Sequence, residues 1–315
     1  MWRPGPDATY ADGDDASWMG VDWGAKQRFM TLLGRPINVL DTGEPAGEPS
    51  GPPLLFVHGW SANWQSWLLT IPAFMGSRRC VALDLPGFGF STMPADPISI
   101  QGYARVVDAL CAELGIGTVV AIGNSMGGFV CAELALAFPT RVERIVLVSA
   151  AGLSIERQPR RPTVAVARLL AAGYPLAEPF ESLVVRRARL RRTAMALIVR
   201  YPEKLSAPLA HELVQASGKP GFLPALDALM SYSYRDRLPE IEVPVLIVWG
   251  RNDAVVPVRD AEDYGQLIGP NARTVVFDDT GHAPMIERPS RFNALLDEFL
   301  EGAAAPERDV PGVSA

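Results

Sequence analysis

Short, almost continuously apolar segments recur along this chain, with helical patterns between most of them. The apolar runs read PLLFV, RRCVALD, GTVVAIG, RIVLVSA, VPVLIVWG and RTVVFDD. Runs of this kind are typical of strands that are buried on both faces of a mainly parallel sheet. Helical patterns over residues 99–114, 125–138, 258–268 and 289–300 separate the later runs. This alternation predicts a doubly wound α/β domain.

Two parts of the chain depart from the alternation. The first two β-rich runs, residues 27–33 and 35–41, have no helix between them and predict an antiparallel hairpin at the edge of the sheet. Residues 153–238 contain no strong strand pattern, and several prolines interrupt their helical stretches. We interpret this segment as a helical insertion.

The predicted organisation is a core of residues 26–152 and 239–302, interrupted by a helical cap at residues 153–238. Residues 1–25 and 303–315 are rich in Asp, Gly, Ala and Pro, and we expect them to form a flexible N-terminal arm and a flexible tail.

The charge balance argues against nucleic acid as a partner, since the net charge is −6 over 315 residues. Positive charge gathers in residues 153–200, which hold ten arginines and three glutamates. We interpret this segment as a solvated helix face, with an anion-attracting patch as the alternative.

Several classes of protein lack support in the sequence. The three cysteines have no metal-binding or disulfide spacing and the three histidines are scattered, so we expect buried thiols and no metal. There is no phosphate loop, dinucleotide fingerprint, secretory signal or apolar run of membrane-spanning length. These features predict a cytoplasmic protein without a cofactor or stable membrane insertion.

The motif Gly-Asn-Ser-Met-Gly-Gly at residues 123–128 follows an apolar run and opens a helical segment. A strand, tight turn and helix around G-x-S-x-G are the elements of a nucleophile elbow, which presents the serine at the end of a sheet. We therefore predict Ser125 as the nucleophile. The helix N-terminus favours negative charge, and the N–H of Met126 would face a developing oxyanion.

A serine nucleophile needs a general base, and the chain has only three histidines. His282 lies in the loop after the last predicted strand and is our candidate. His211 lies in a helical pattern of the insertion, where we expect an ordinary surface histidine. His58 ends a strand, and we expect a structural role for it.

The base in turn needs a carboxylate that holds its tautomer. Asp253 follows the apolar run VPVLIVWG directly, which predicts a position at the carboxyl edge of the sheet. The order Ser125, Asp253, His282 is also that of nucleophile, acid and base in enzymes with a nucleophile elbow. Asp278 and Asp279 are the alternatives for the acid.

A second oxyanion donor is expected in the segment His-Gly-Trp after the run PLLFV. Gly59 would let the backbone turn so that the N–H of Trp60 faces the cleft beside that of Met126. Apolar residues near the catalytic loops suggest an acyl pocket lined by Gly59, Trp64, Phe129 and Met285.

With these motifs in this order, the chain resembles α/β-hydrolase-fold enzymes that carry a helical cap, from about Lys26 to Leu300. The resemblance implies an eight-stranded, mostly parallel sheet flanked by helices, with the cap over the site. It includes DLPGFGFS at residues 84–91, similar to the family's turn after an early strand. Asp84 is then a turn-forming residue at the mouth of the site, because it precedes Ser125.

The resemblance leaves several activities open. Hydrolysis of small-molecule carboxylic esters with small to medium apolar acyl groups is our first hypothesis, since Ser125 argues against the dehalogenases and epoxide hydrolases of this fold. Carbon–carbon bond hydrolases of vinylogous diketo acids share the elbow motif and a cap, although a tryptophan follows their base where this chain has Ala283. A perhydrolase, or a non-catalytic ligand-binding protein of the same fold, are the remaining alternatives.

Overall fold

A computed structural model of the protein describes residues 10–12, 17–155 and 181–302, with positions 162, 163, 165, 167–169 and 172 between them. The predicted tail at residues 303–315 lies outside the described residues.

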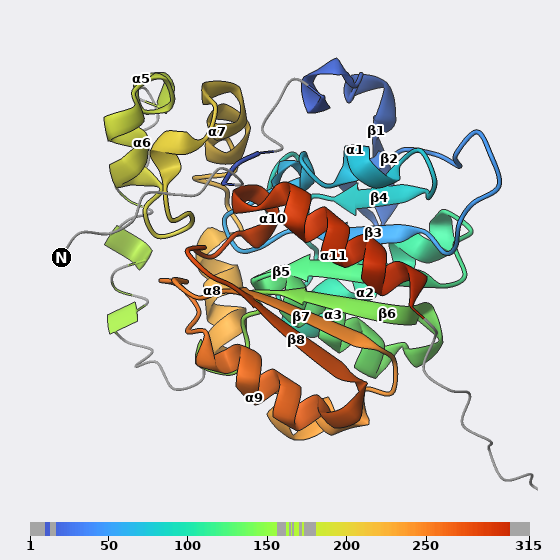
Figure 1. Ribbon diagram of the computed structural model, residues 1–315. Coiled ribbons are helices and arrows are strands. Elements are labelled where there is room, and N and C mark those ends of the chain that lie inside the picture. Colours follow the sequence, from blue (N-terminus) through green and yellow to red (C-terminus); the bar gives the residue numbers. More distant parts are fainter. Residues whose placement is uncertain are drawn as a thin grey trace, which may run out of the picture.

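The core is an eight-stranded sheet with the strand order β1-β2-β4-β3-β5-β6-β7-β8 (Figure 1). β3 to β8 run parallel, and β2 is antiparallel to both β1 and β4. The strands are β1 Gln27–Leu32, β2 Arg35–Asp41, β3 Leu54–Val57, β4 Cys80–Leu83, β5 Val119–Asn124, β6 Val142–Val148, β7 Val245–Gly250 and β8 Ala272–Phe277. The predicted fold class and the edge hairpin are confirmed.

The central strands are buried along their whole length, as their apolar sequences predict. Successive side chains of a strand point to opposite faces, so Leu55 and Val57 belong to one hydrophobic cluster while Leu54 and Phe56 belong to another. The sheet therefore separates two cores.

Helices cover both faces of the sheet (Figure 1). One cluster includes side chains of α2, α3 and α9, and the other includes side chains of α1, α10 and α11. Their bounds are α1 Ile71–Phe74, α2 Ile100–Glu113, α3 Met126–Ala137, α9 Arg259–Ile268, α10 Pro284–Glu287 and α11 Pro289–Glu301. Short 3₁₀ helices are η1 Trp18–Gly20, η2 Gly24–Lys26, η3 Trp64–Trp67, η4 Pro139–Arg141 and η9 Gly269–Asn271.

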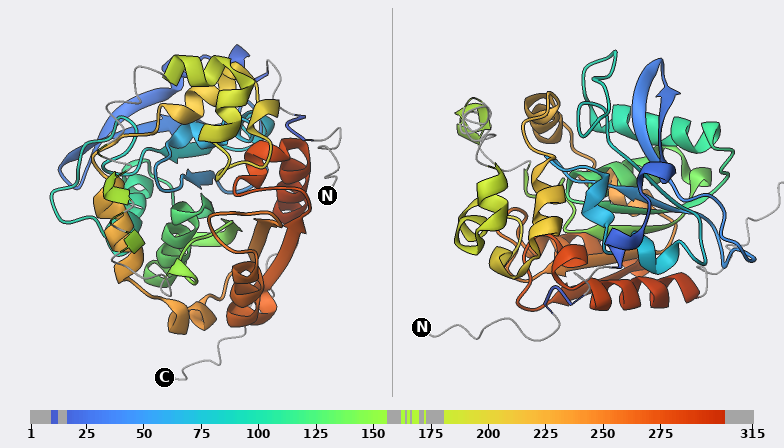
Figure 2. Two further views of the ribbon diagram at one scale, coloured as in Figure 1. Left: turned by 90° about the vertical axis from the view of Figure 1, so that its left-hand side faces the viewer. Right: turned by 90° about the horizontal axis from the view of Figure 1, so that it is seen from above.

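The described part of the predicted insertion, residues 153–238, consists of helices joined by turns and loops, and none of its described residues lies in a strand. Its helices are α5 Glu181–Arg186, α6 Ala188–Ala194, η7 Pro202–Lys204, α7 Ala207–Val214, α8 Phe222–Ser231 and η8 Arg235–Glu240. α5, α6 and α7 gather to one side of the sheet, away from α9 and α11 (Figures 1 and 2).

The described part of the N-terminal arm is packed more tightly than the expected flexible segment. Tyr10 and Trp18 are buried, and the N–H of Ala11 donates a hydrogen bond to the carbonyl of Glu287 at 2.8 Å. Long-range contacts thus hold this part of the arm. Across the described residues, no helix has the length and apolar character needed to cross a bilayer.

Candidate active site

The turn between β5 and α3 contains Ser125, with φ +55° and ψ −118°. This strained conformation matches the sharp strand-to-helix turn of a nucleophile elbow. Close backbone approach explains the neighbouring glycines. A Cβ on Gly123 would lie 2.2 Å from the carbonyl oxygen of Gly127, and one on Gly127 would lie 2.1 Å from that of Val57.

The candidate base and acid are in direct contact. His282 Nδ1 lies 2.7 Å from Asp253 Oδ2, and the side chain of Asp253 is fully buried. The other carboxylate oxygen of Asp253 accepts hydrogen bonds from the N–H groups of Val255 at 2.8 Å and Val256 at 2.9 Å. Two backbone donors thus hold the carboxylate while its free edge faces the imidazole.

The alternative acids lie elsewhere. Asp278 is exposed and pairs with Arg251, whose hydrogen bond and charge lower the pKa of its carboxyl. Asp279 accepts a hydrogen bond from the hydroxyl of Tyr201 at 2.9 Å. Among the described contacts, neither carboxylate meets the ring of His282.

Asn124 connects the elbow to the histidine loop, a role that our sequence reasoning missed. Its amide donates to the carbonyl of Val148 at 3.1 Å and to the carbonyl of His282 at 3.2 Å. The position directly before Ser125 in the elbow motif was the available signal. The insertion also holds this loop, because the N–H of His282 donates to the carbonyl of Ile198 at 2.9 Å.

The predicted oxyanion donors lie beside the elbow. A Cβ on Gly59 would be 3.1 Å from the Cβ of Ser125, so the loop after β3 passes next to the serine. Met126 begins α3, and in the described part of the chain neither its N–H nor that of Trp60 has a hydrogen-bond acceptor. Both N–H groups therefore remain the candidate oxyanion donors.

Trp60 also contacts the insertion. Its ring stacks on Phe222 with centroids 4.2 Å apart, and its Nε1 donates to the carbonyl of Phe222 at 2.7 Å. The start of α8 is therefore fixed against the loop that carries a candidate oxyanion donor.

The remaining histidines differ from His282. His58 is fully buried, accepts a hydrogen bond at Nε2 from the N–H of Leu85 at 2.8 Å, and has Nδ1 2.7 Å from the carbonyl of Gly59. Burial lowers its pKa, with the charge of Asp84 acting in the opposite direction. His211 is exposed on α7.

Most of the predicted lining of an acyl pocket is packed in the hydrophobic core. Trp64, Phe129 and Met285 are at most 2% exposed, and all three belong to the hydrophobic clusters. Phe129 lies on the opposite face of the sheet from the other two, and its ring packs 4.1 Å from that of Tyr234. These side chains pack in the hydrophobic clusters, and their part in an acyl pocket stays a prediction. Of the predicted lining, Gly59 lies against the side chain of Ser125, and the N–H of Phe129 donates to the carbonyl of Ser125 at 3.3 Å.

Asp84 is also more deeply buried than expected. It is 0% exposed, and its carboxylate accepts hydrogen bonds from the N–H groups of Trp64 at 3.0 Å and Phe90 at 2.9 Å. It therefore organises the turn, as predicted.

A family model described as alpha/beta hydrolase fold matches residues 52–289. This protein belongs to that family. The match spans β3 to α10 and includes the elbow, Asp253 and His282.

Several curated proteins resemble this alpha/beta hydrolase. It is 30% identical over 258 residues to the dihydrolipoyllysine-residue acetyltransferase component of the acetoin cleaving system of Cupriavidus necator, covering 79% of this chain but only 63% of the relative. It is 29% identical over 300 residues to 2-hydroxymuconate semialdehyde hydrolase of Pseudomonas sp., covering 88% and 95%. It is also 29% identical over 255 residues to pimeloyl-[acyl-carrier protein] methyl ester esterase of Aeromonas hydrophila, covering 79% and 96%.

Solved structures show the same architecture. A thermophilic esterase from Thermogutta terrifontis superposes with a TM-score of 0.68 at 22% identity, covering 87% of this chain and 97% of its own, which supports the fold alone. An N-acyl homoserine lactone degrading enzyme superposes with a TM-score of 0.66 at 26% identity, covering 86% and 100%. The relatives of this alpha/beta hydrolase thus include esterases and a carbon–carbon bond hydrolase.

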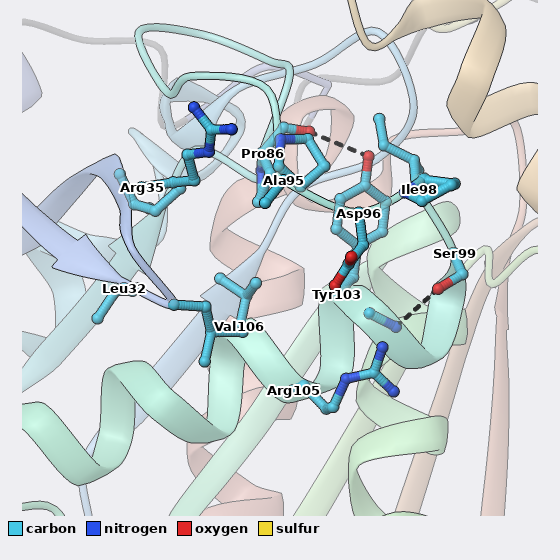
Figure 3. Close-up of a pocket in the computed structure, with 15 residues that line it drawn as sticks. Leu32, Arg35, Pro86, Ala95, Asp96, Ile98, Ser99, Tyr103, Arg105 and Val106 are labelled. Atoms are coloured by element: carbon cyan, nitrogen blue, oxygen red, sulfur yellow. Dashed lines mark hydrogen bonds between the residues drawn. The ribbon is translucent and has the colours of Figure 1, made fainter.

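A separate hollow of this alpha/beta hydrolase lies between the β1–β2 hairpin, residues 94–99 and α2 (Figure 3). Arg35, Tyr103 and Arg105 line it, whereas none of the candidate catalytic residues does. Among the described residues, no group of His, Cys, Asp or Glu side chains is arranged to hold a metal ion.

Proposed function

We propose that this alpha/beta hydrolase cleaves carboxylic esters of small to medium apolar acyl groups through an acyl-enzyme on Ser125. The observation that carries the proposal is the 2.7 Å contact between His282 Nδ1 and the buried carboxylate of Asp253. β5, β7 and β8 run in the same direction, so the loops that carry Ser125, Asp253 and His282 follow the same edge of the sheet.

In the first step, Ser125 Oγ attacks the ester carbonyl carbon while His282 Nε2 accepts the hydroxyl proton. Asp253 favours the tautomer with the proton on Nδ1 and stabilises the imidazolium that forms. The carbonyl oxygen becomes negatively charged and accepts hydrogen bonds from the N–H groups of Trp60 and Met126. Collapse of this intermediate breaks the ester bond, and His282 returns the proton to the departing alcohol.

In the second step, a water molecule attacks the acyl-enzyme. His282 accepts a proton from this water, the same two N–H groups bind the oxyanion, and the serine leaves with that proton. The products are a carboxylic acid, an alcohol and the free enzyme. No cofactor or metal is needed for this sequence.

We further propose that residues 153–238 form a cap over this site. The contacts of Phe222 with Trp60 and of Ile198 with His282 support it, because both join the insertion to candidate catalytic loops. A cap limits access of water and the size of the acyl group.

Carbon–carbon bond hydrolysis is the second candidate. Its support is the similarity to 2-hydroxymuconate semialdehyde hydrolase over 95% of that relative. The same serine and histidine would act, and a cationic side chain would bind the substrate carboxylate. The arginines of the cap are candidates for that contact.

The test compares hydrolysis of p-nitrophenyl butyrate by the wild-type protein and by Ser125→Ala, with a fluorophosphonate probe as a second readout. Ester hydrolysis and labelling that both disappear with the serine would support the proposal. Labelling of Ser125 together with faster turnover of a vinylogous diketo acid than of any ester would favour the second candidate. A wild-type protein that is neither active nor labelled would indicate a ligand-binding protein.

A further inference from the structure

Glu287, the last residue of α10, is a completely buried carboxylate that the proposed mechanism does not use. The N–H of Gly281 donates to both of its oxygens at 2.9 Å, and that of Ala283 donates to Oε1 at 3.2 Å. These two residues immediately precede and follow His282. The backbone on both sides of the candidate base is therefore bonded to one side chain.

Two further donors come from distant parts of the chain. The N–H of Arg200, in the insertion, donates to Glu287 Oε2 at 2.7 Å. The hydroxyl of Tyr10, in the N-terminal arm, donates to the same oxygen at 2.9 Å. Burial raises the pKa of the Glu287 carboxyl, while these hydrogen bonds favour its ionised form.

Tyr10 extends the connection to the cap. Its hydroxyl accepts a hydrogen bond from the N–H of Tyr201 at 2.8 Å, and the two rings meet edge to face with centroids 5.2 Å apart. The guanidinium carbon of Arg288 lies 5.1 Å from the centre of the Tyr10 ring. Arm, cap and histidine loop thus converge on one buried site.

We propose that Glu287 and Tyr10 are positioning residues for His282. Resting on the function proposed above, the inference is that they fix the backbone around the base, so that Nδ1 stays on Asp253 and Nε2 stays aimed at the serine hydroxyl. Glu287 acts directly on the loop, and Tyr10 acts through Glu287 and the cap. A small displacement of a catalytic group is enough to slow a reaction strongly, which gives such a support a catalytic effect.

The first test is Tyr10→Phe, which keeps the ring but removes one donor to Glu287 and the acceptor for Tyr201. The matched control is Tyr103→Phe, which removes the 3.1 Å hydrogen bond from another buried tyrosine to the carbonyl of Pro86, away from the site (Figure 3). The free energy of one buried hydrogen bond corresponds to a factor of about three to ten in an equilibrium or rate constant. We expect Tyr10→Phe to lower kcat on p-nitrophenyl butyrate by about that factor with KM unchanged.

Thermal unfolding separates positioning from general stability. Both variants should lower Tm, Tyr10→Phe by more because it loses two hydrogen bonds, but Tyr103→Phe should retain wild-type kcat. Equal kcat in the wild-type protein and Tyr10→Phe would overturn the inference, as would an equal loss of kcat in the control. An inactive, unlabelled wild-type protein would overturn the proposed function, and this inference with it.

Glu287→Gln is the stronger variant, because its amide nitrogen cannot accept the hydrogen bonds that one carboxylate oxygen now receives. We expect kcat to fall by about a hundred-fold with KM within about two-fold of wild type. Fluorophosphonate labelling of Ser125 should slow in parallel. A folded Glu287→Gln protein with wild-type kcat would contradict the proposal, and Tyr10→Phe keeps it testable if that variant does not fold.

Discussion

The loops after β3 and β8 each carry a buried histidine, and the partners of the two rings differ. His58, after β3, has Nε2 bonded to the N–H of Leu85 and Nδ1 2.7 Å from the carbonyl of Gly59. His282, after β8, has Nδ1 on Asp253, and its Nε2 has no partner among the described residues. Both rings are held in place, but of the two only His282 has a ring nitrogen that could accept a proton from a serine.

The difference shows how one residue type takes two roles on the same sheet. An imidazole with both nitrogens bonded to the backbone would have to give up a hydrogen bond to gain a proton, and burial makes the charge costly. A carboxylate on Nδ1 instead stabilises the protonated ring while Nε2 exchanges the proton. The partners of the ring, more than its burial, separate a structural histidine from a candidate base.

The largest expected effect comes from His282→Gln, because removal of the proposed general base would abolish activation of the serine. We expect kcat to fall by about 10⁴-fold or more, with Tm close to wild type. The kcat of Ser125→Ala should fall by a similar factor. The kcat of the variant that combines Ser125→Ala with His282→Gln should be no lower than that of either single variant. A His282→Gln protein that retains a tenth of wild-type turnover would transfer the base to another residue.

Asp253→Asn should have the next largest effect. The amide keeps the shape but offers no charge, and its nitrogen favours the wrong tautomer, so we expect about 10³- to 10⁴-fold lower kcat. Asp278→Asn is the matched control, since its exposed side chain pairs with Arg251, and it should stay within about two-fold of wild type. Steady-state rates on p-nitrophenyl butyrate measure both; a mild loss in Asp253→Asn would contradict the assignment.

Asn124→Ala should have a moderate effect, because it leaves the carbonyls of His282 and Val148 without their side-chain donor. We expect about ten-fold lower kcat and a free energy of unfolding lower by about 1–3 kcal/mol. Urea unfolding and steady-state kinetics measure the two quantities. Lower stability with wild-type kcat would mean that the bridge to the histidine loop has no catalytic role.

The smallest expected effect on turnover is that of His58→Gln, with kcat within about three-fold of wild type. Its signature is the pH dependence of stability. Burial lowers the pKa of His58 in the folded protein, so below about pH 6.5 the unfolded chain binds a proton that the folded protein does not. The free energy of unfolding of the wild-type protein should therefore fall, by up to about 1.4 kcal/mol per pH unit for this group, as the pH drops from 6.5.

Urea titrations between pH 7.5 and 5 measure this dependence. The difference between the free energies of unfolding of the wild-type protein and of His58→Gln should become smaller as the pH falls. His211→Gln, at an exposed position of α7, should leave the wild-type dependence in place. A constant difference across this range would show that His58 is not held in its neutral form.

The fold could be predicted from the sequence because the apolar patterns that indicate strands are local. The run VPVLIVWG predicts a buried strand wherever it occurs, and β7 begins and ends within it at Val245 and Gly250. The strand positions then brought Asp253 and the elbow to one edge, because parallel strands end together. The contact between Asp253 and His282 agrees with that expectation in geometry.

Local sequence patterns could not predict the direction of side chains or the long-range polar contacts. Phe129 follows Ser125 closely, but one turn of α3 points it into the core beneath the sheet. Glu287 gave no signal, because its donors include Tyr10 and Arg200, which no local pattern connects with it. Pairings across hundreds of residues depend on the completed fold.

The contact between Tyr10 and Glu287 joins residues 277 positions apart, and a ribosome makes them at very different times. At about 5–20 residues per second, roughly 14 to 55 s separate their synthesis. His282 and the carboxylate that supports its loop are among the last parts of the described chain to be made. During translation the candidate nucleophile Ser125 therefore exists for many seconds before its candidate base His282 does, so a nascent or prematurely ended chain carries the elbow without the residues proposed to activate it.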